Sequence, residues 1–157
     1  MNPRVLAFLV VSVPVLIGAV LFGPFAWDLV THRRPPDRIL VPAGYIGWVR
    51  VDFGVKGAPP LPREQRRLLI ALNPDATLKT STLRPEGFGK DEYFYLSGTS
   101  RTPLSTSGVC KGGMIWGLVT SEDPGSGGYE YEKFFVGTED QFRHEVDPSG
   151  KNYSPCE

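Results

Sequence analysis

Residues 44–55, with the sequence GYIGWVRVDFGV, carry the pattern that decides the fold. Two sets of side chains alternate along it, Val49, Val51, Phe53 and Val55 in one set and Trp48, Arg50 and Asp52 in the other. Successive side chains of a β-strand point to opposite faces of its sheet, so this period of two predicts a strand with one buried face. The prolines of the GAPPLP segment that follows lack amide donors, which ends regular strand pairing there.

Short apolar runs separated by turn residues continue from this strand towards the C-terminus. The runs cover residues 68–72, 77–81, 92–96, 114–120 and 129–136. Runs of this length, with no amphipathic helix between them, are typical of antiparallel β-structure. We therefore predict a mainly β fold, an antiparallel β-sandwich or small barrel of about six to seven strands.

One short helix is expected near the C-terminus, after the last of these strands. Thr138 can cap its first turn, and Gln141, three residues later, completes a capping box. The helix would end before Asp147 and Pro148, because proline cannot continue it. Residues 97–108, SGTSRTPLSTSG, are rich in small polar side chains and are expected to form an exposed loop.

The N-terminal segment has the composition of a membrane-spanning helix. No residue from Val5 to Trp27 is charged, and a helix of that stretch would be roughly 34 Å long, enough to cross a bilayer core of about 30 Å. We therefore expect a transmembrane anchor over residues 1–28, a linker over residues 29–38 and the β-domain over residues 39–157. A cleaved signal peptide with Arg4 as its positive residue is the alternative.

The two cysteines bear on which side of the membrane the β-domain lies. Cys110 and Cys156 are the only cysteines, and both follow the expected anchor. A disulfide between them would tie the last residues to the domain and would persist only in an oxidising compartment. The alternative is a pair of unrelated thiols. We expect the bridge, and with it a single-pass membrane protein whose domain is extracytoplasmic.

The charge balance and the histidine count exclude several partners. The chain has 17 basic residues (lysine and arginine) and 17 acidic residues (aspartate and glutamate), and both kinds are scattered along it. There is therefore no basic stripe that could bind nucleic acid. The only histidines are His32 and His144, too few to build a zinc or iron site with the usual ligand spacing. We expect neither a metal nor another cofactor.

Aromatic side chains on the predicted strands are the best candidates for a binding site. Two tyrosine pairs have a spacing of two and should each share a face of a strand. A flat aromatic face could stack sugar rings or hold a proline-rich peptide, although cross-strand packing alone also explains such pairs. The candidate ligand-binding residues are Trp48, Tyr93, Tyr95, Trp116, Tyr129 and Tyr131.

Several segments together resemble an uncharacterised bacterial family, a domain of unknown function found in membrane-anchored or exported proteins. The resemblance lies in GYIGWVRVDFGVKGAPPLPRE, which contains a GYxGWVxVxFGxxGAPPLP-type motif, and in KDEYFYLSG, GGMIWG and FFVGTEDQFRHE. It covers the chain from Ile39 to Cys156 and implies an N-terminal anchor beside a compact β-domain. It carries over no catalytic residue. The order of the strands is also similar to that of transthyretin-like β-sandwiches.

These observations favour a membrane-tethered, non-catalytic binding or interaction module of the cell envelope. Its partners, besides the membrane, would be an envelope polysaccharide, peptide or protein. One alternative is an envelope hydrolase with a pair of carboxylates as acid and base, for which the pairs are Asp91 with Glu92, Glu130 with Glu132, and Glu139 with Asp140. The other alternative is an accessory subunit of a membrane complex.

Overall fold

The computed structural model describes residues 34–87, 89–122 and 129–150 of the chain. The expected membrane anchor, most of the linker, and Cys156 lie outside these residues. Within the described ranges, no helix combines the length and apolar character that a membrane crossing requires. The β-rich unit begins at Pro35.

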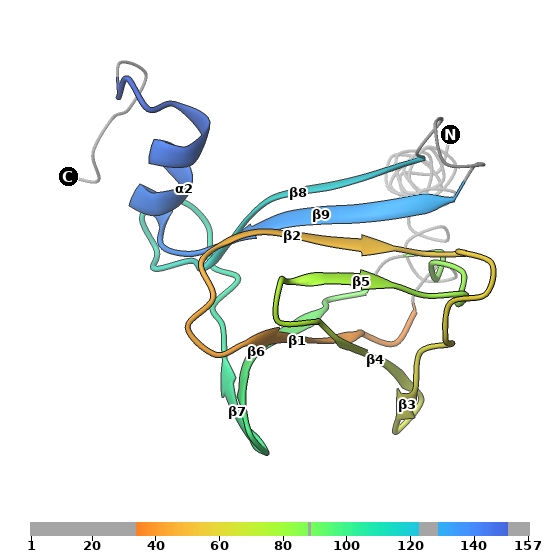
Figure 1. Ribbon diagram of the computed structural model, residues 1–157. Helices are drawn as coiled ribbons and strands as arrows, with labels where there is room; N and C mark the ends of the chain where they lie inside the picture. The colour runs from red at the N-terminus through yellow and green to blue at the C-terminus, as the bar shows by residue number, and fades with distance from the viewer. Residues whose placement is uncertain (1–33, 88, 123–128, 151–157) are drawn as a thin grey trace, which may run out of the picture. The chain divides into compact units, whose positions relative to one another are not determined.

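Within the described residues, nine strands form two mixed sheets. The five-stranded sheet has the order β3-β4-β1-β6-β7, and the four-stranded sheet has the order β5-β2-β9-β8 (Figure 1). The strands are β1 (Arg38–Pro42), β2 (Gly47–Asp52), β3 (Arg63–Glu64), β4 (Arg67–Ala71), β5 (Thr77–Lys79), β6 (Glu92–Ser97), β7 (Ser100–Pro103), β8 (Ile115–Glu122) and β9 (Glu130–Val136).

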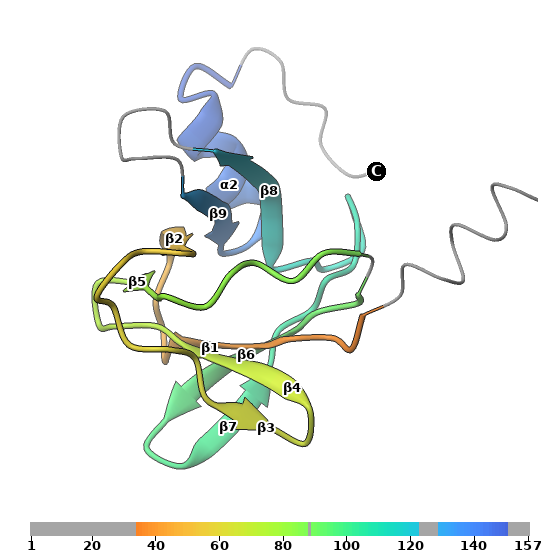
Figure 2. The same cartoon turned by 90° about the vertical axis from the view of Figure 1, so that its right-hand side faces the viewer.

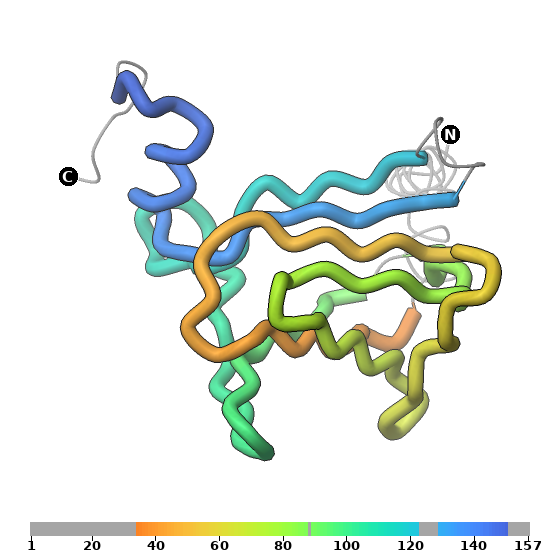
Figure 3. Tube along the Cα trace, viewed as in Figure 1, coloured from red at the N-terminus to blue at the C-terminus, as the bar shows by residue number. Residues whose placement is uncertain are grey.

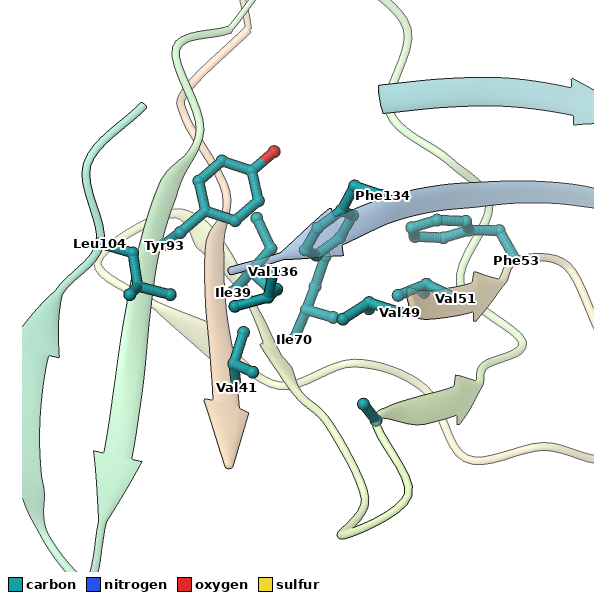
Figure 4. Close-up of a cluster of buried hydrophobic side chains, with 11 residues drawn as sticks. Ile39, Val41, Val49, Val51, Phe53, Ile70, Tyr93, Leu104, Phe134 and Val136 are labelled. Atoms are coloured by element: carbon teal, nitrogen blue, oxygen red, sulfur yellow. The ribbon is translucent and has the colours of Figure 1, made fainter. Parts of the chain in front are cut away.

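The two sheets lie on either side of one hydrophobic core, as the two layers in Figure 2 show. In the four-stranded sheet, β2 and β9 run antiparallel and turn Val49, Val51 and Phe134 inward. From the five-stranded sheet, β1 contributes Ile39 and Val41. The core side chains fill the space between the sheets in Figure 4, so burial of these apolar faces is what holds the layers together.

The prediction of a mainly β chain with a short C-terminal helix is confirmed, but the prediction of antiparallel sheets is wrong. Strand β1 runs parallel to both of its neighbours, β4 and β6, and β2 runs parallel to β5. After β1 the chain turns and passes to the other sheet, where it becomes β2 (Figure 3). Where consecutive strands are placed in different sheets, as β1 and β2 are, strands of the same direction can become neighbours within each sheet.

The strand count also exceeds the predicted six to seven, because short strands lie in segments without an apolar pattern. Residues 97–108 were expected to be a loop, yet they contain β7, which pairs with β6 through a tight turn at Gly98, where φ is +60°. Strand β1 has three consecutive buried residues, Ile39, Leu40 and Val41, in place of alternation. Such a run is typical of a central strand with parallel neighbours.

Helix α2 (Glu139–Val146) begins with the predicted capping box. Thr138 Oγ1 accepts a hydrogen bond from the Gln141 amide at 3.3 Å, and Gln141 Oε1 accepts one from the Thr138 amide at 2.8 Å. The helix packs through Phe142, whose ring stacks on Trp116 with 6.0 Å between centroids. Gly117, at a φ of +59°, lies directly under Phe142, so a methyl group there would be 3.1 Å from the ring.

The substitution Gly117→Ala tests whether α2 packs on the sheet through this contact. Alanine at a positive φ is strained, and its methyl group would push Phe142 away from the sheet, so the free energy of unfolding should fall by about 1 kcal/mol or more. Chemical denaturation measures the change. The matched control is Gly98→Ala, at a φ of +60° with no atom within 4 Å of the added methyl group, which carries the same backbone strain without the contact and should lower the free energy of unfolding less. Equal effects at the two glycines would contradict this packing.

Candidate functional site

The pairing of β2 with β9 sorts their side chains onto two faces. Residues directly opposite each other in an antiparallel pair point to the same side of the sheet. Because Val49 lies opposite the core residue Phe134, the alternating positions form the other side, here called the outer face. The outer face carries Trp48, Arg50 and Asp52 from β2, Tyr131, Lys133 and Phe135 from β9, and Trp116, Val119 and Ser121 from β8.

Helix α2 covers one end of the outer face and builds an aromatic cluster there. The Phe142 ring lies 6.0 Å from that of Trp48 and 5.6 Å from that of Phe135. Trp116 is buried, and its indole N–H donates to the Gly137 carbonyl at 2.9 Å. Trp48 is half-buried and donates to Glu145 on the helix at 3.2 Å. This end of the face is therefore occupied by the protein's own helix.

Beyond the helix, the outer face presents two cations lying over aromatic rings. The Lys133 ammonium is 4.2 Å from the centre of the Trp48 ring, and the Arg50 guanidinium carbon is 4.3 Å from the centre of the Tyr131 ring. Such contacts are worth roughly 0.5–1 kcal/mol at exposed sites. Arg50 Nε also donates to Asp52 Oδ1 at 2.7 Å, where the Arg50 side chain is 38% exposed.

The register places these two cations directly opposite each other. Arg50 of β2 pairs with Lys133 of β9, and like charges in that position destabilise a sheet. Their contacts with Tyr131 and Trp48 draw the charged ends towards opposite ends of the face. In the part of the chain that the structure describes, no carboxylate forms an ion pair with Lys133. The face therefore offers positive charge between two aromatic rings.

The predicted aromatic residues do not form one surface. Trp48, Trp116 and Tyr131 lie on the outer face of the four-stranded sheet. Tyr93 and Tyr95 share a face, as their spacing predicts, but they belong to β6 and pack with the hydrophobic core. Tyr129 comes just before β9 and is half-buried.

The two tyrosines of β6 have structural contacts. The Tyr93 ring meets that of Phe134 edge-on with 5.2 Å between centroids, as Figure 4 shows. The Tyr95 hydroxyl donates to the Tyr45 carbonyl at 2.8 Å. Burial raises the pKa of the Tyr95 hydroxyl, because the interior disfavours its ionised form. These contacts leave Tyr93 and Tyr95 no role on the outer face.

The five-stranded sheet carries a second charged surface, in which acidic and basic groups pair with each other. Arg38 contacts Glu64 at 2.7 Å and Glu92 at 3.0 Å, while Arg67 contacts Glu92 and Arg101 contacts Glu64. The pKa of Glu92 is lowered mainly by the hydrogen bond from Arg38, and that of Glu64 by those from Arg101 and Arg38. This network neutralises itself, unlike the outer face around Lys133.

Most of the carboxylates considered for hydrolysis contact other groups of the protein. Asp91 accepts a hydrogen bond from the Asp37 amide at 2.8 Å, and its neighbour Glu92 belongs to the arginine network. Glu132 points inward, is buried, and lies 3.5 Å from Arg84, whereas Glu130, on the same strand, is exposed. Although their spacing of two puts both on one face of β9, only Glu132 is buried.

Glu139, at the start of α2, connects the helix to the preceding loop. It accepts a hydrogen bond from the Cys110 amide at 2.6 Å and pairs with Arg143 one helical turn later. The Cys110 amide is the main cause of the lowered pKa of Glu139, with Arg143 second. The predicted bridge from Cys110 to Cys156 stays a prediction, because Cys156 lies outside the described residues. Across the described ranges, no group of three or more His, Cys, Asp or Glu side chains is arranged to hold a metal ion.

The cations of the outer face were not among the predicted site residues. The alternation in residues 44–55 already places Arg50 on the face of Trp48, but its partner Lys133 comes from a strand far along the chain. Only the register of β2 against β9 brings the two together. No pattern within a single strand could have indicated this juxtaposition.

Comparison with known proteins identifies the family. A search of curated proteins finds no match. Among solved structures, the chain is similar to one titled "Putative Lipoprotein from Bacillus anthracis", with 23% identity, a TM-score of 0.53, and coverage of 79% of this chain and 85% of that one. That likeness concerns the fold. A family model, described as a family of unknown function, matches residues 33–146 and confirms the resemblance to an uncharacterised family. The chain belongs to this family, DUF6843.

Proposed function

We propose that this protein is a membrane-tethered, non-catalytic binding module of the cell envelope, and that its ligand binds the outer face of the four-stranded sheet. The observation that carries the proposal is the direct opposition of Arg50 and Lys133, each over an aromatic ring, on a partly exposed surface. Two facing cations repel each other. An anionic ligand between them would relieve this repulsion. The outer face therefore favours binding of a negatively charged ligand.

The aromatic rings specify the ligand further. Tyr131 and Trp48 flank the two cations, and flat aromatic surfaces next to polar groups suit sugar rings, which have apolar faces and polar edges. An acidic polysaccharide combines sugar rings with regularly spaced carboxylates. It matches the outer face better than a neutral polymer, because it brings negative charge to Lys133, for which the described residues supply no carboxylate partner.

Two observations support a location in the envelope. The stretch from Val5 to Trp27 has no charged residue and is long enough to cross a bilayer as a helix. The protein of similar fold from Bacillus anthracis is titled a putative lipoprotein, and a lipid anchor would likewise hold a β-domain at a membrane surface. An extracytoplasmic side suits the expected bridge between Cys110 and Cys156.

Hydrolysis has less support than binding. Glu92 and Glu139 each contact arginine and have a lowered pKa, and Glu132 is buried beside Arg84. A general acid needs a raised pKa to keep its proton at neutral pH. The contacts of Glu92 and Glu139 act in the opposite direction.

The tether predicts how the full-length chain fractionates. Produced in bacterial cells, it should stay in the membrane fraction after an alkaline carbonate wash, because an inserted apolar helix is not released by charge. Under non-reducing conditions its thiols should resist a membrane-impermeant maleimide until a reductant is added. A mature protein that is freely soluble and begins beyond Trp27 would contradict the tether.

The ligand class is tested with polygalacturonate as the acidic polysaccharide and dextran as the neutral one. The full-length protein in detergent should bind polygalacturonate, and Lys133→Gln should weaken binding about fivefold, the range of one exposed ion pair. Isothermal titration calorimetry measures both. Lys111→Gln removes the same charge from an exposed loop position and should bind like the wild type. Equal binding by Lys133→Gln and wild type, or no binding of the acidic polymer, would contradict the assignment.

A further inference from the structure

The chain passes from β2 in one sheet to β3 in the other through a segment that is dense in proline (Figure 1). Residues 58–62, with the sequence APPLP and here called the proline segment, belong to no helix or strand. Proline fixes its own φ near about −65° and holds the residue before it in an extended conformation. Every residue of the proline segment is a proline or precedes one. The sequence therefore favours a polyproline II helix, which has about three residues per turn.

The burial of the proline segment follows the same period. Ala58 and Leu61, three residues apart, are half-buried, whereas Pro59, Pro60 and Pro62 are exposed. Leu61 packs against the hydrophobic core. One edge of the polyproline II helix is thus turned towards the domain, and the two edges that carry the proline rings face solvent.

Two threonine side chains hold the backbone of the proline segment in place. Thr80 Oγ1 donates to the Pro59 carbonyl at 2.9 Å, and the Leu61 amide donates to Thr82 Oγ1 at 2.8 Å. Thr80 has no exposed surface, so the first of these contacts is part of the interior. A partner that binds the proline segment does not have to order it, which removes one of the usual costs of binding a peptide.

Basic side chains flank the proline segment on both sides. Lys56 precedes it, Arg63 and Arg66 follow it, and all three are exposed. Among the described residues, no carboxylate forms an ion pair with any of them. The one acidic residue between Lys56 and Arg66 is Glu64, which pairs with two arginines of the charged network. Exposed proline rings therefore lie next to positive charge that the described residues do not compensate.

We infer that the proline segment is the docking site for a second protein, whose groove is lined by aromatic side chains and bordered by carboxylates, as in an SH3 domain. Such grooves bind the exposed proline edges of a PxxP sequence in the polyproline II conformation. Pro59 to Pro62 is a PxxP sequence, and Arg63 follows it directly. Carboxylates beside the groove would complement the flanking cations. A single proline suffices to end strand pairing, so that role does not require three exposed rings.

The probe is an isotopically labelled SH3 domain with acidic residues beside its groove, titrated with unlabelled full-length protein in detergent and followed by NMR. The wild type should shift or broaden the signals of the groove. Pro62→Ala should weaken binding about fivefold or more, because it removes one of the two rings of the PxxP sequence. Pro103→Ala removes an exposed proline from β7 and should bind like the wild type. The same SH3 domain with a groove tryptophan replaced by alanine should not bind.

The charge is tested separately with Arg63→Gln, which should weaken binding about threefold, with a smaller effect at high salt. This variant changes an exposed side chain and decides the question if thermal unfolding shows that Pro62→Ala is not folded. Lys133→Gln should bind the SH3 domain like the wild type, so the result is independent of whether the outer face binds a polysaccharide. Unchanged groove signals with the wild type overturn the inference. So does wild-type binding by folded Pro62→Ala, by Arg63→Gln, or to the SH3 domain that lacks its groove tryptophan.

Discussion

Burial of the inner faces of two sheets against each other is the interaction on which the rest of this structure depends. Phe134 has no exposed surface and touches the opposite sheet through Tyr93, and replacing such a phenylalanine by alanine typically costs roughly 3–5 kcal/mol. The cation contacts on the outer face are worth roughly 0.5–1 kcal/mol each. The core therefore determines the fold, and the outer face can differ in charge with little effect on stability.

This division of roles places the candidate site. The inner positions of β2 and β9 are taken by packing, so only the alternate positions are open to a ligand. Helix α2 covers the end of the outer face at Trp116, and what is left open is the part with Arg50, Tyr131 and Lys133. The paired charges of the other sheet, around Arg38 and Glu92, bind each other. The proposed ligand face is thus the one surface among those described where opposed cations lie beside aromatic rings.

The sequence predicted those features that depend on neighbouring residues. Alternation located β2 with the correct buried side, and Thr138 with Gln141 located the start of α2. The parallel neighbours of β1 could not be predicted in this way, because they depend on where the chain passes between sheets. Strand β7 has no buried residue, so nothing in its composition distinguishes it from a loop.

The same distinction applies to the site. Trp48 and Tyr131 were candidates from their side chains alone, and both lie on the outer face. Tyr93 and Tyr95 were candidates on the same grounds, yet the pairing of β6 with β1 turns their side chains towards the core. Lys133 became a candidate only through its register with Arg50. Their roles in ligand binding stay predictions, because long-range pairing explains where the side chains lie and not what they bind.

Amide hydrogen exchange in the full-length protein tests the central role of the two-sheet core most directly. If burial between the sheets holds the fold, the slowest-exchanging amides will be those of β1, β2 and β9, which open only when the whole core opens. The two-residue edge strand β3 should exchange much faster. Exchange of β1 amides as fast as those of β3 would contradict a core built on the contact between these sheets.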